Sequence, residues 1–178
     1  MLLLYSFLLL LSTLQNEQDI VVWQNSRKLE YSDFKMDGTK IEMLARSNLE
    51  MVYSHSIRND TFRYDVYPVF YKKYSFINEL HPMTLLHEQI HFDIMEVCAR
   101  LIRKKFRSKE YSLYNDDSIT MCINKINEQA IMLNRKFDSE TETDDLELST
   151  LKKWNDTIQN TLNSLSEFEN KEGYLFLK

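Results

Sequence analysis

The chain has 178 residues, of which 43% are hydrophobic, and its formal net charge is -5 at pH 7. This length and apolar content are sufficient for one folded domain with a packed core, so they exclude a wholly disordered chain. The negative charge offers no basic surface to a polyanion, so we do not expect nucleic-acid binding. Only two glycines and two prolines occur, which favours long helices over frequent tight turns.

The first residues have the composition of a targeting segment. Residues 2–14 are almost entirely apolar, and residues 15–18 are polar. The apolar run is shorter than the roughly 20 residues that span a bilayer, and it resembles the apolar core of a signal peptide. We therefore expect residues 1–18 to be a signal peptide or an N-terminal anchor and the protein to be periplasmic or secreted. Any contact with the membrane would be made through this segment alone.

Two strands are predicted after this segment. Residues 45–53 alternate apolar and polar side chains, and residues 61–73 alternate more clearly, with many aromatic and β-branched types. Pro68 has no amide hydrogen to donate to a sheet. It therefore predicts that the second strand lies at an edge of the sheet or ends locally.

Three helices are predicted after the strands. Pro82 suits the first turn of a helix that runs to about Phe106. Apolar residues at every third or fourth position predict a second helix over residues 117–137 and a third over 146–168, joined by an acidic link. This order predicts an α+β fold, in which residues 19–170 form a small N-terminal antiparallel sheet followed by three long helices. Residues 171–178 are predicted to be a C-terminal tail.

The two cysteines, Cys98 and Cys122, both fall on predicted helices. In an oxidising compartment they could form a disulfide that joins the two helices. They are equally well interpreted as two small buried apolar side chains.

The sharpest signal is the run His87-Glu88-Gln89-Ile90-His91. Two histidines four residues apart lie on one face of a helix, where both can bind one metal ion. Glu88 is rotated by about 100° from His87, from where it can activate a metal-bound water and carry its proton. The pattern therefore predicts a Zn²⁺ hydrolase with His87 and His91 as metal ligands and Glu88 as the catalytic residue.

A helical wheel divides this helix into two faces. Both histidines lie on the side of the apolar residues, so we expect them to point inward. The opposite face is polar and is expected to face solvent; it consists of Gln89, Asp93, Glu96, Arg100 and Arg103. Glu96 is therefore excluded as a metal ligand, and we expect it to form a solvated ion pair with Arg100.

A catalytic zinc ion usually has three protein ligands, so a third must come from elsewhere in the chain. The candidates are the other imidazoles and nearby carboxylates, namely His55, His81, Glu128, Asp138, Glu140, Glu142, Asp144 and Asp145.

Three segments together resemble a known family. They are Leu-Glu-Tyr-Ser-Asp-Phe-Lys at residues 29–35, the motif with its neighbours at residues 85–94, and Phe-Asp-Ser-Glu-Thr at residues 137–141. They look like segments of a bacterial family of exported domains of unknown function, described as zinc-dependent proteases of the zincin type. The resemblance implies a zincin-like fold and a peptide or protein substrate. The peptide is expected to lie along the strand at residues 61–73, with its scissile bond at the zinc.

The chain departs from the family after residue 141. There the family continues Thr-x-His-Gly, whereas this chain has Thr143 at the position of the histidine. If that histidine is the family's third ligand, the resemblance implies Asp144 as the best replacement, because carboxylate oxygen is an acceptable zinc ligand. Glu140 and Glu142 remain alternatives. The alternative function is a non-catalytic zincin-like binding or scaffold protein that has lost its third ligand.

Overall fold

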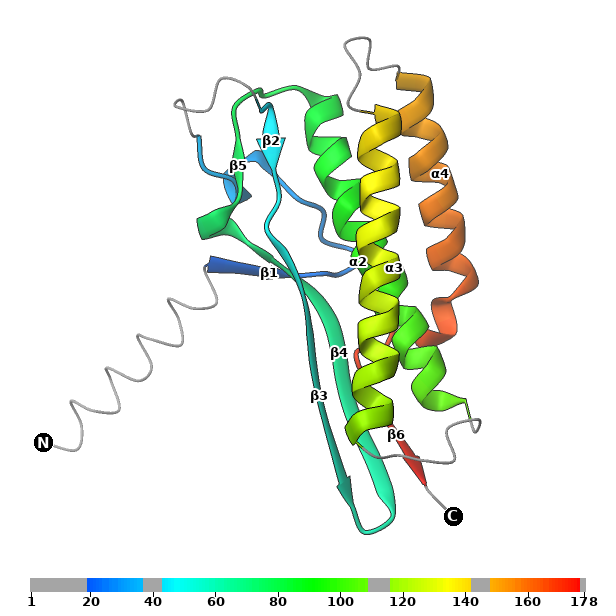
Figure 1. Cartoon of the computed structure of the whole chain (residues 1–178). Coiled ribbons are helices and arrows are strands. Elements are labelled where there is room, and N and C mark those ends of the chain that lie inside the picture. The colour runs from blue at the N-terminus through cyan, green and yellow to red at the C-terminus, as the bar shows by residue number, and fades with distance from the viewer. Residues whose placement is uncertain (1–18, 37–42, 109–115, 142–147, 177–178) are drawn as a thin grey trace, which may run out of the picture.

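The computed structural model of the protein describes residues 19–36, 43–108, 116–141 and 148–176 (Figure 1). These residues form an α+β fold. The strands are β1 (Ile20–Val22), β2 (Ala45–Arg46), β3 (Leu49–Arg58), β4 (Thr61–Tyr71), β5 (Phe76–Ile77) and β6 (Glu172–Phe176). The long helices are α2 (Pro82–Arg107), α3 (Asp116–Thr141) and α4 (Leu148–Ser164). Short 3-10 turns occur at Tyr31–Asp33, Lys72–Tyr74 and Ser166–Phe168.

Strand β4 is the centre of the main sheet. It pairs with β3 along one side, and with β1 and β6 at separate places along the other side, always antiparallel. The turn between β3 and β4 contains Asn59 and Asp60, which both have positive φ, 51° and 55°. Two successive residues of this kind form the type I′ turn that suits the twist of a hairpin. Strands β2 and β5 form a small separate pair.

The prediction drawn from Pro68 is wrong, because β4 continues through this residue and has partners on both sides. The carbonyl oxygen of Pro68 accepts a hydrogen bond from the Trp23 amide at 3.2 Å, on the side where β1 pairs. In an antiparallel strand the missing N–H would point to that same side. Pro68 lies just beyond the last β1 pair, Val22 with Val69, and outside the β6 pairing, which covers residues 61–65, so its missing N–H interrupts neither of these pairings. The other predicted strand, 45–53, is divided into β2 and a longer β3.

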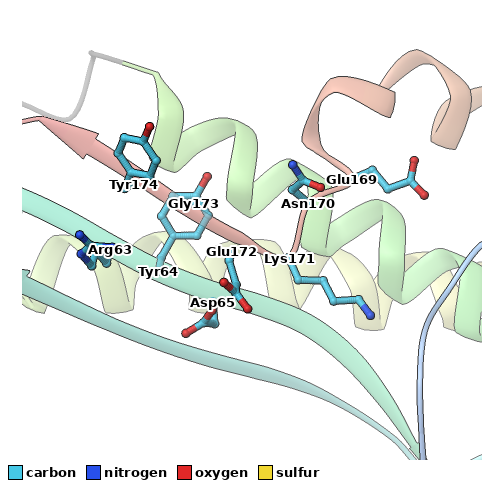
Figure 2. A pocket seen from close by; sticks show the side chains of 9 residues that line it. All are labelled: Arg63, Tyr64, Asp65, Glu169, Asn170, Lys171, Glu172, Gly173 and Tyr174. Carbon is cyan, nitrogen blue, oxygen red and sulfur yellow. The ribbon is translucent and has the colours of Figure 1, made fainter.

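The predicted C-terminal tail, residues 171–178, instead contributes strand β6 to the sheet. The sheet is therefore not confined to the N-terminal part of the chain. Gly173 lies opposite Tyr64 of β4, and a Cβ at this glycine would overlap the Tyr64 ring (Figure 2). Only glycine leaves room for this ring, which is buried under β6. A hollow of about 640 Å³ lies beside this pairing and is lined by residues of β4, β6 and the segment before β6.

The three predicted helices are confirmed. Helix α2 begins at Pro82, and the preceding His81 caps it, because its Nδ1 accepts the amide hydrogen of Met83 at 3.2 Å. Helix α3 continues to Thr141, beyond the predicted end at Phe137, so Asp138 lies on a helix rather than in an acidic link. Figure 1 shows α2 between the sheet and the pair formed by α3 and α4. This central position determines what surrounds the histidine motif.

The predicted solvent face of α2 is buried. Its five polar residues are exposed by no more than a few per cent: Gln89 7%, Asp93 0%, Glu96 0%, Arg100 3% and Arg103 0%. Helix α4, the segment that follows β1 and the C-terminal segment pack over this side of the helix. Buried polar groups are stable there only because they satisfy one another's hydrogen bonds. The prediction was wrong because polarity alone does not distinguish a solvent-exposed face from a buried face whose polar groups bond to other protein groups.

The carboxylate of Asp93 connects three parts of the chain. It accepts hydrogen bonds from Trp23 Nε1, Gln89 Nε2 and Gln159 Nε2, each at 2.7 Å. Gln89 in turn accepts the backbone N–H of Leu29 at 2.7 Å. These contacts attach the N-terminal segment and α4 to the helix that carries the histidines.

Glu96 forms the predicted pair with Arg100 at 2.9 Å, but the pair is buried rather than solvated. It also pairs with Arg103 at 3.0 Å. Arg103 further donates to the carbonyl oxygens of Val66 at 2.8 Å and Phe168 at 2.7 Å. Its guanidinium thus fills the gap along β4 between β1 and β6. Glu96 is fully engaged and contributes nothing to the histidine pair.

Both cysteines are buried free thiols, so the disulfide is not formed. Burial raises the pKa of Cys98 to about 12, which keeps the thiol neutral. The interpretation of Cys98 and Cys122 as small core side chains therefore holds.

None of the described helices is long and apolar enough to cross a membrane. Residues 1–18, on which the export prediction rests, lie outside the described part of the chain.

Candidate metal centre

Three donor atoms from two helices converge on one point. The Nε2 atoms of His87 and His91 on α2 are 3.0 Å apart. Asp138 on α3 places Oδ1 at 2.8 Å from His91 Nε2 and at 3.5 Å from His87 Nε2. Within the described residues, these three side chains form the one group whose donor atoms could hold a metal ion. The predicted pair therefore gains a third donor.

These spacings fit a small metal ion. Zinc bonds to histidine nitrogen and carboxylate oxygen are about 2.0–2.1 Å long, so neighbouring donors of a tetrahedral site are about 3.3 Å apart. The three observed separations lie between 2.8 and 3.5 Å. Asp138 Oδ1 is buried, and it accepts no well-directed hydrogen bond from any residue that the structure describes. A cation between the three atoms would satisfy this oxygen.

The second nitrogen of His91 fixes which ring nitrogen is free. Its Nδ1 lies 2.7 Å from Asn134 Oδ1, and the Asn134 amide nitrogen donates to the Ala130 carbonyl at 2.9 Å. Because the amide nitrogen is used there, Asn134 can only accept from His91. Nδ1 therefore carries the hydrogen, and in the neutral ring Nε2 has a free lone pair for a metal.

His87 is oriented in the same way by the last turn of α3. Its Nδ1 lies 3.4 Å from Thr141 Oγ1, and this hydroxyl donates to the Phe137 carbonyl at 2.7 Å. The hydroxyl can therefore accept from His87 Nδ1, which again leaves Nε2 free. The buried Phe137 ring packs against both imidazoles, with centroids 4.5 Å from His87 and 4.9 Å from His91. Both rings are thus held in the orientation that binding needs.

The charges of the cluster are consistent with a cation site. Burial and the charge of His91 lower the pKa of His87 to about 4, so this ring is neutral. Burial opposes charge on His91 as well, but Asp138 and Glu88 outweigh it and raise the pKa of His91. Burial also opposes ionisation of Asp138, yet contact with His91 lowers the pKa of this carboxyl. The cluster therefore favours one positive charge beside the carboxylate.

Glu88 lies beside the cluster without belonging to it. Its side chain is only 4% exposed, and it lines the same cleft as His91 and Asp138. Burial raises the pKa of Glu88, and the charge on His91 opposes this shift. A carboxyl group with a raised pKa, next to a cluster of metal-binding side-chain types and open to a cleft, is well suited to proton transfer.

The cleft has a volume of about 630 Å³ and lies between β3 and α3, with α2 as its floor. It is lined by Ser47, Leu49, Glu50, Met51, Glu88, His91, Met95, Asn127, Ala130, Ile131, Asn134, Arg135 and Asp138. In the described part of the chain, three buried side-chain oxygens make no hydrogen bond of good geometry, and all three line this cleft: Ser47 Oγ, Asn127 Oδ1 and Asp138 Oδ1. Buried polar atoms without partners are rare, and their concentration here indicates a site for a ligand, ion or water.

The other candidates for the third ligand have different positions. Glu142, Asp144 and Asp145 lie outside the described residues, so the prediction of Asp144 remains untested. The described candidates that do not belong to the cluster are His55, His81, Glu128 and Glu140. His81 caps α2, and Glu140 accepts a hydrogen bond from Trp154 Nε1 at 2.9 Å.

Asn134 and Thr141, which orient the histidines, were missed by the sequence interpretation. Together with Asp138 they recur at intervals of four and three along α3, so they share one face of that helix. A polar stripe of this kind, beside the apolar stripe, was the available signal.

No family model, curated protein or solved structure matches the chain. The interpretation of this site therefore rests on its geometry.

Proposed function

We propose that the protein is a zinc-dependent hydrolase of peptide bonds in which Glu88 acts as the general base. The observation that supports this most strongly is the convergence of two oriented imidazole nitrogens and one carboxylate oxygen, in a cluster of which His91 and Asp138 line a cleft. Two histidines and one carboxylate, with a further position left open, are a usual ligand set for catalytic zinc. His87, His91 and Asp138 would hold the ion. When bound, zinc would polarise a carbonyl group and lower the pKa of water.

Glu88 supplies the proton transfers of the proposed reaction. Its carboxylate takes a proton from water while the water oxygen forms a bond to the peptide carbonyl carbon. The same proton then passes to the amide nitrogen as the carbon–nitrogen bond breaks, so Glu88 ends as it began. The raised pKa that burial gives Glu88 favours both steps, because the group must accept the proton and release it again.

The substrate would lie beside β3 and not along residues 61–73. Strand β4 has partners on both sides, so it has no free edge for a peptide, and that prediction is wrong. Strand β3 is last in the order of the described sheet, and its first residues, Leu49 to Met51, line the cleft. An extended peptide that pairs with the outer edge of β3 would pass over the metal cluster.

The alternative of a non-catalytic binding or scaffold protein rested on the missing histidine at position 143. Asp138 weakens this argument, because it provides a third donor without that histidine. The buried oxygens without partners also concentrate in the cleft, as expected for a site that binds polar ligands. We therefore prefer the hydrolase.

The experiment is a comparison of the wild type with Glu88→Gln. We expect both proteins to retain about one zinc per chain after dialysis, since Glu88 is not a ligand. Hydrolysis of an unstructured protein such as casein should fall by roughly a hundredfold or more in the variant, because general-base catalysis is lost. A variant that hydrolyses at the wild-type rate would contradict the role of Glu88. A wild type that retains zinc and hydrolyses no peptide would favour the non-catalytic alternative.

The proposed location outside the cytoplasm rests on the apolar run at residues 2–14 alone. Fractionation of bacteria that express the full chain tests it. We expect either recovery in the periplasm or medium with the N-terminal residues removed, or recovery of a chain that its uncleaved N-terminal segment attaches to the membrane. Recovery of the intact chain in the cytoplasm would contradict it.

A further inference from the structure

The α3 wall of the cleft presents a regular row of side chains. Asn127, Ile131, Arg135 and Asp138 line the cleft and follow one another at intervals of four, four and three. This spacing places them along one side of the helix. At a rise of 1.5 Å per residue the row is about 16 Å long, which matches about five residues of extended peptide. A bound peptide would thus meet these side chains in sequence, beginning at the metal cluster.

Among the described residues that line the cleft, Arg135 is the only lysine or arginine. It is exposed, and it has no hydrogen bond or ion pair with any residue that the structure describes. The arginines of α2 behave differently, since Arg100, Arg103 and Arg107 all donate to protein oxygens. On the opposite wall, Glu50 already accepts the Tyr71 hydroxyl at 2.6 Å. Arg135 is therefore a positively charged group of the cleft that is available to a ligand.

We propose that Arg135 binds a carboxylate of the substrate close to the scissile bond, so that the cleft selects peptides with an acidic group there. This inference rests on the proposed function. Arg135 precedes Asp138 by three residues, about 4.5 Å along the helix, which corresponds to one or two residues of extended peptide. A guanidinium is well suited to this role because it can bind both oxygens of a carboxylate at once.

The rest of the row refines the preferred substrate. Ile131 lies about one helical turn farther from the metal cluster than Arg135. Its side chain is 51% exposed within the cleft, where a substrate side chain can cover it. Asn127 lies one turn beyond, with its buried Oδ1 free to accept an N–H of the peptide backbone. The row thus offers a cation, an apolar surface and a hydrogen-bond acceptor, in that order from the metal cluster.

The test measures binding to the zinc-loaded Glu88→Gln chain, which keeps the cleft but does not turn over. The probes are short peptides with an uncharged N-terminal fluorophore and an amidated C-terminus, uncharged except for one central residue, which is Asp, Asn or Lys. We expect the Asp peptide to bind roughly tenfold more tightly than the Asn peptide in fluorescence anisotropy. Arg135→Gln should abolish this difference, and Arg135→Glu should transfer the preference to the Lys peptide.

Lys136→Gln is the matched control. It removes the same charge one residue away, but Lys136 does not line the cleft, and its Nζ lies 3.8 Å from Glu140 Oε1. The preference for Asp should persist in this variant. A decrease equal to that of Arg135→Gln would show an effect of net charge only and would overturn the inference.

A further peptide, without Asp but with a free C-terminal carboxylate, distinguishes the two sources of the acidic group. Tighter binding of this peptide indicates that Arg135 holds the end of the chain, whereas tighter binding of the amidated Asp peptide indicates an internal acidic residue; either result supports the inference. Equal binding of all four peptides would overturn it. Because binding is measured without turnover, this failure is distinct from failure of the proposed function, which would appear as a wild type without hydrolysis.

Discussion

The two sides of α2 both carry polar groups, which are buried toward α4 and half-buried toward α3, and their hydrogen bonding differs. On the side toward α4 and the C-terminal segment, Asp93, Glu96 and Arg103 bond to several protein groups each. On the side toward α3, His87, His91 and Asp138 direct their donor atoms at one another, around a buried oxygen without a hydrogen bond from the described residues. The first arrangement is complete without a ligand, and the second is not. Hydrogen-bond satisfaction thus distinguishes a scaffold from a site.

The largest expected effect on stability concerns the side of α2 toward α4, which we call the paired side. Arg103→Met removes the donor to Val66 and Phe168 and one partner of Glu96, so buried polar groups lose their bonds. We expect a loss of about 3–5 kcal/mol in the free energy of unfolding, measured by denaturant titration of the zinc-free protein. A loss below about 1 kcal/mol would show that this network is not what stabilises the helix.

On the side of α2 toward α3, stability should instead depend on zinc. Zinc at about a thousand times its dissociation constant should stabilise the wild type by about 4 kcal/mol, since it binds the folded state. Asp138→Asn should lose most of this zinc-dependent stabilisation, because the amide is a poorer ligand than the carboxylate. Thermal unfolding with and without zinc measures the difference. An unchanged response in the variant would remove Asp138 from the site.

An intermediate effect is expected where the histidines are oriented. Asn134→Leu removes the acceptor for His91 Nδ1 but leaves all three donors of the cluster in place. Such partners typically contribute a factor of about 10–100 in metal affinity, and we expect a decrease of that size in a chelator competition. Asn134→Asp, which retains an acceptor, is the control and should bind zinc at least as well as the wild type. Equal affinities in Asn134→Leu and the wild type would contradict this role.

The smallest effect extends the comparison to a second paired cluster, at Asp33. This carboxylate accepts from Arg27 at 2.7 Å and pairs with Lys72 at 3.0 Å. Burial opposes its ionisation, but the Arg27 hydrogen bond and the other donors outweigh burial and lower the pKa of Asp33. The stabilisation should therefore be complete above the ordinary carboxyl pKa of about 3.9 and be lost as pH falls through the lower folded value.

We accordingly expect Asp33→Asn to cost about 1–2 kcal/mol at pH 7. The difference from the wild type should narrow below about pH 4, as the wild-type carboxyl takes up its proton. Denaturant unfolding at both pH values measures it. A difference that is independent of pH would mean that the charge of Asp33 contributes nothing.

The helices and the histidine pair were predictable because they depend on spacing within one segment. Apolar periodicity predicted α2 from Pro82 onward, and the four-residue interval placed His87 and His91 together. The helical wheel gave a wrong prediction for the opposite face of α2, where it placed Glu96 and the neighbouring polar residues in solvent. Their burial depends on which other segments pack over them, and helical periodicity carries no information on that.

The third donor was harder to predict for the same reason. Asp138 was one of several acidic candidates, and only the packing of α3 against α2 selects it. The end of α3 was placed at Phe137, where the apolar repeat stops, although the helix continues to Thr141. The partners of β4 and the strand β6 likewise depend on contacts between distant segments, as the position of Pro68 shows.

The central claim, that His87, His91 and Asp138 form a zinc site, is tested most directly by counting zinc ions per chain after exhaustive dialysis. The measurement compares the wild type with Asp138→Asn and with Glu96→Gln, a variant of the paired side of α2. We expect about one zinc per chain in the wild type and in folded Glu96→Gln, and little in Asp138→Asn. No zinc in the wild type, or as much zinc in Asp138→Asn as in the wild type, would contradict the account.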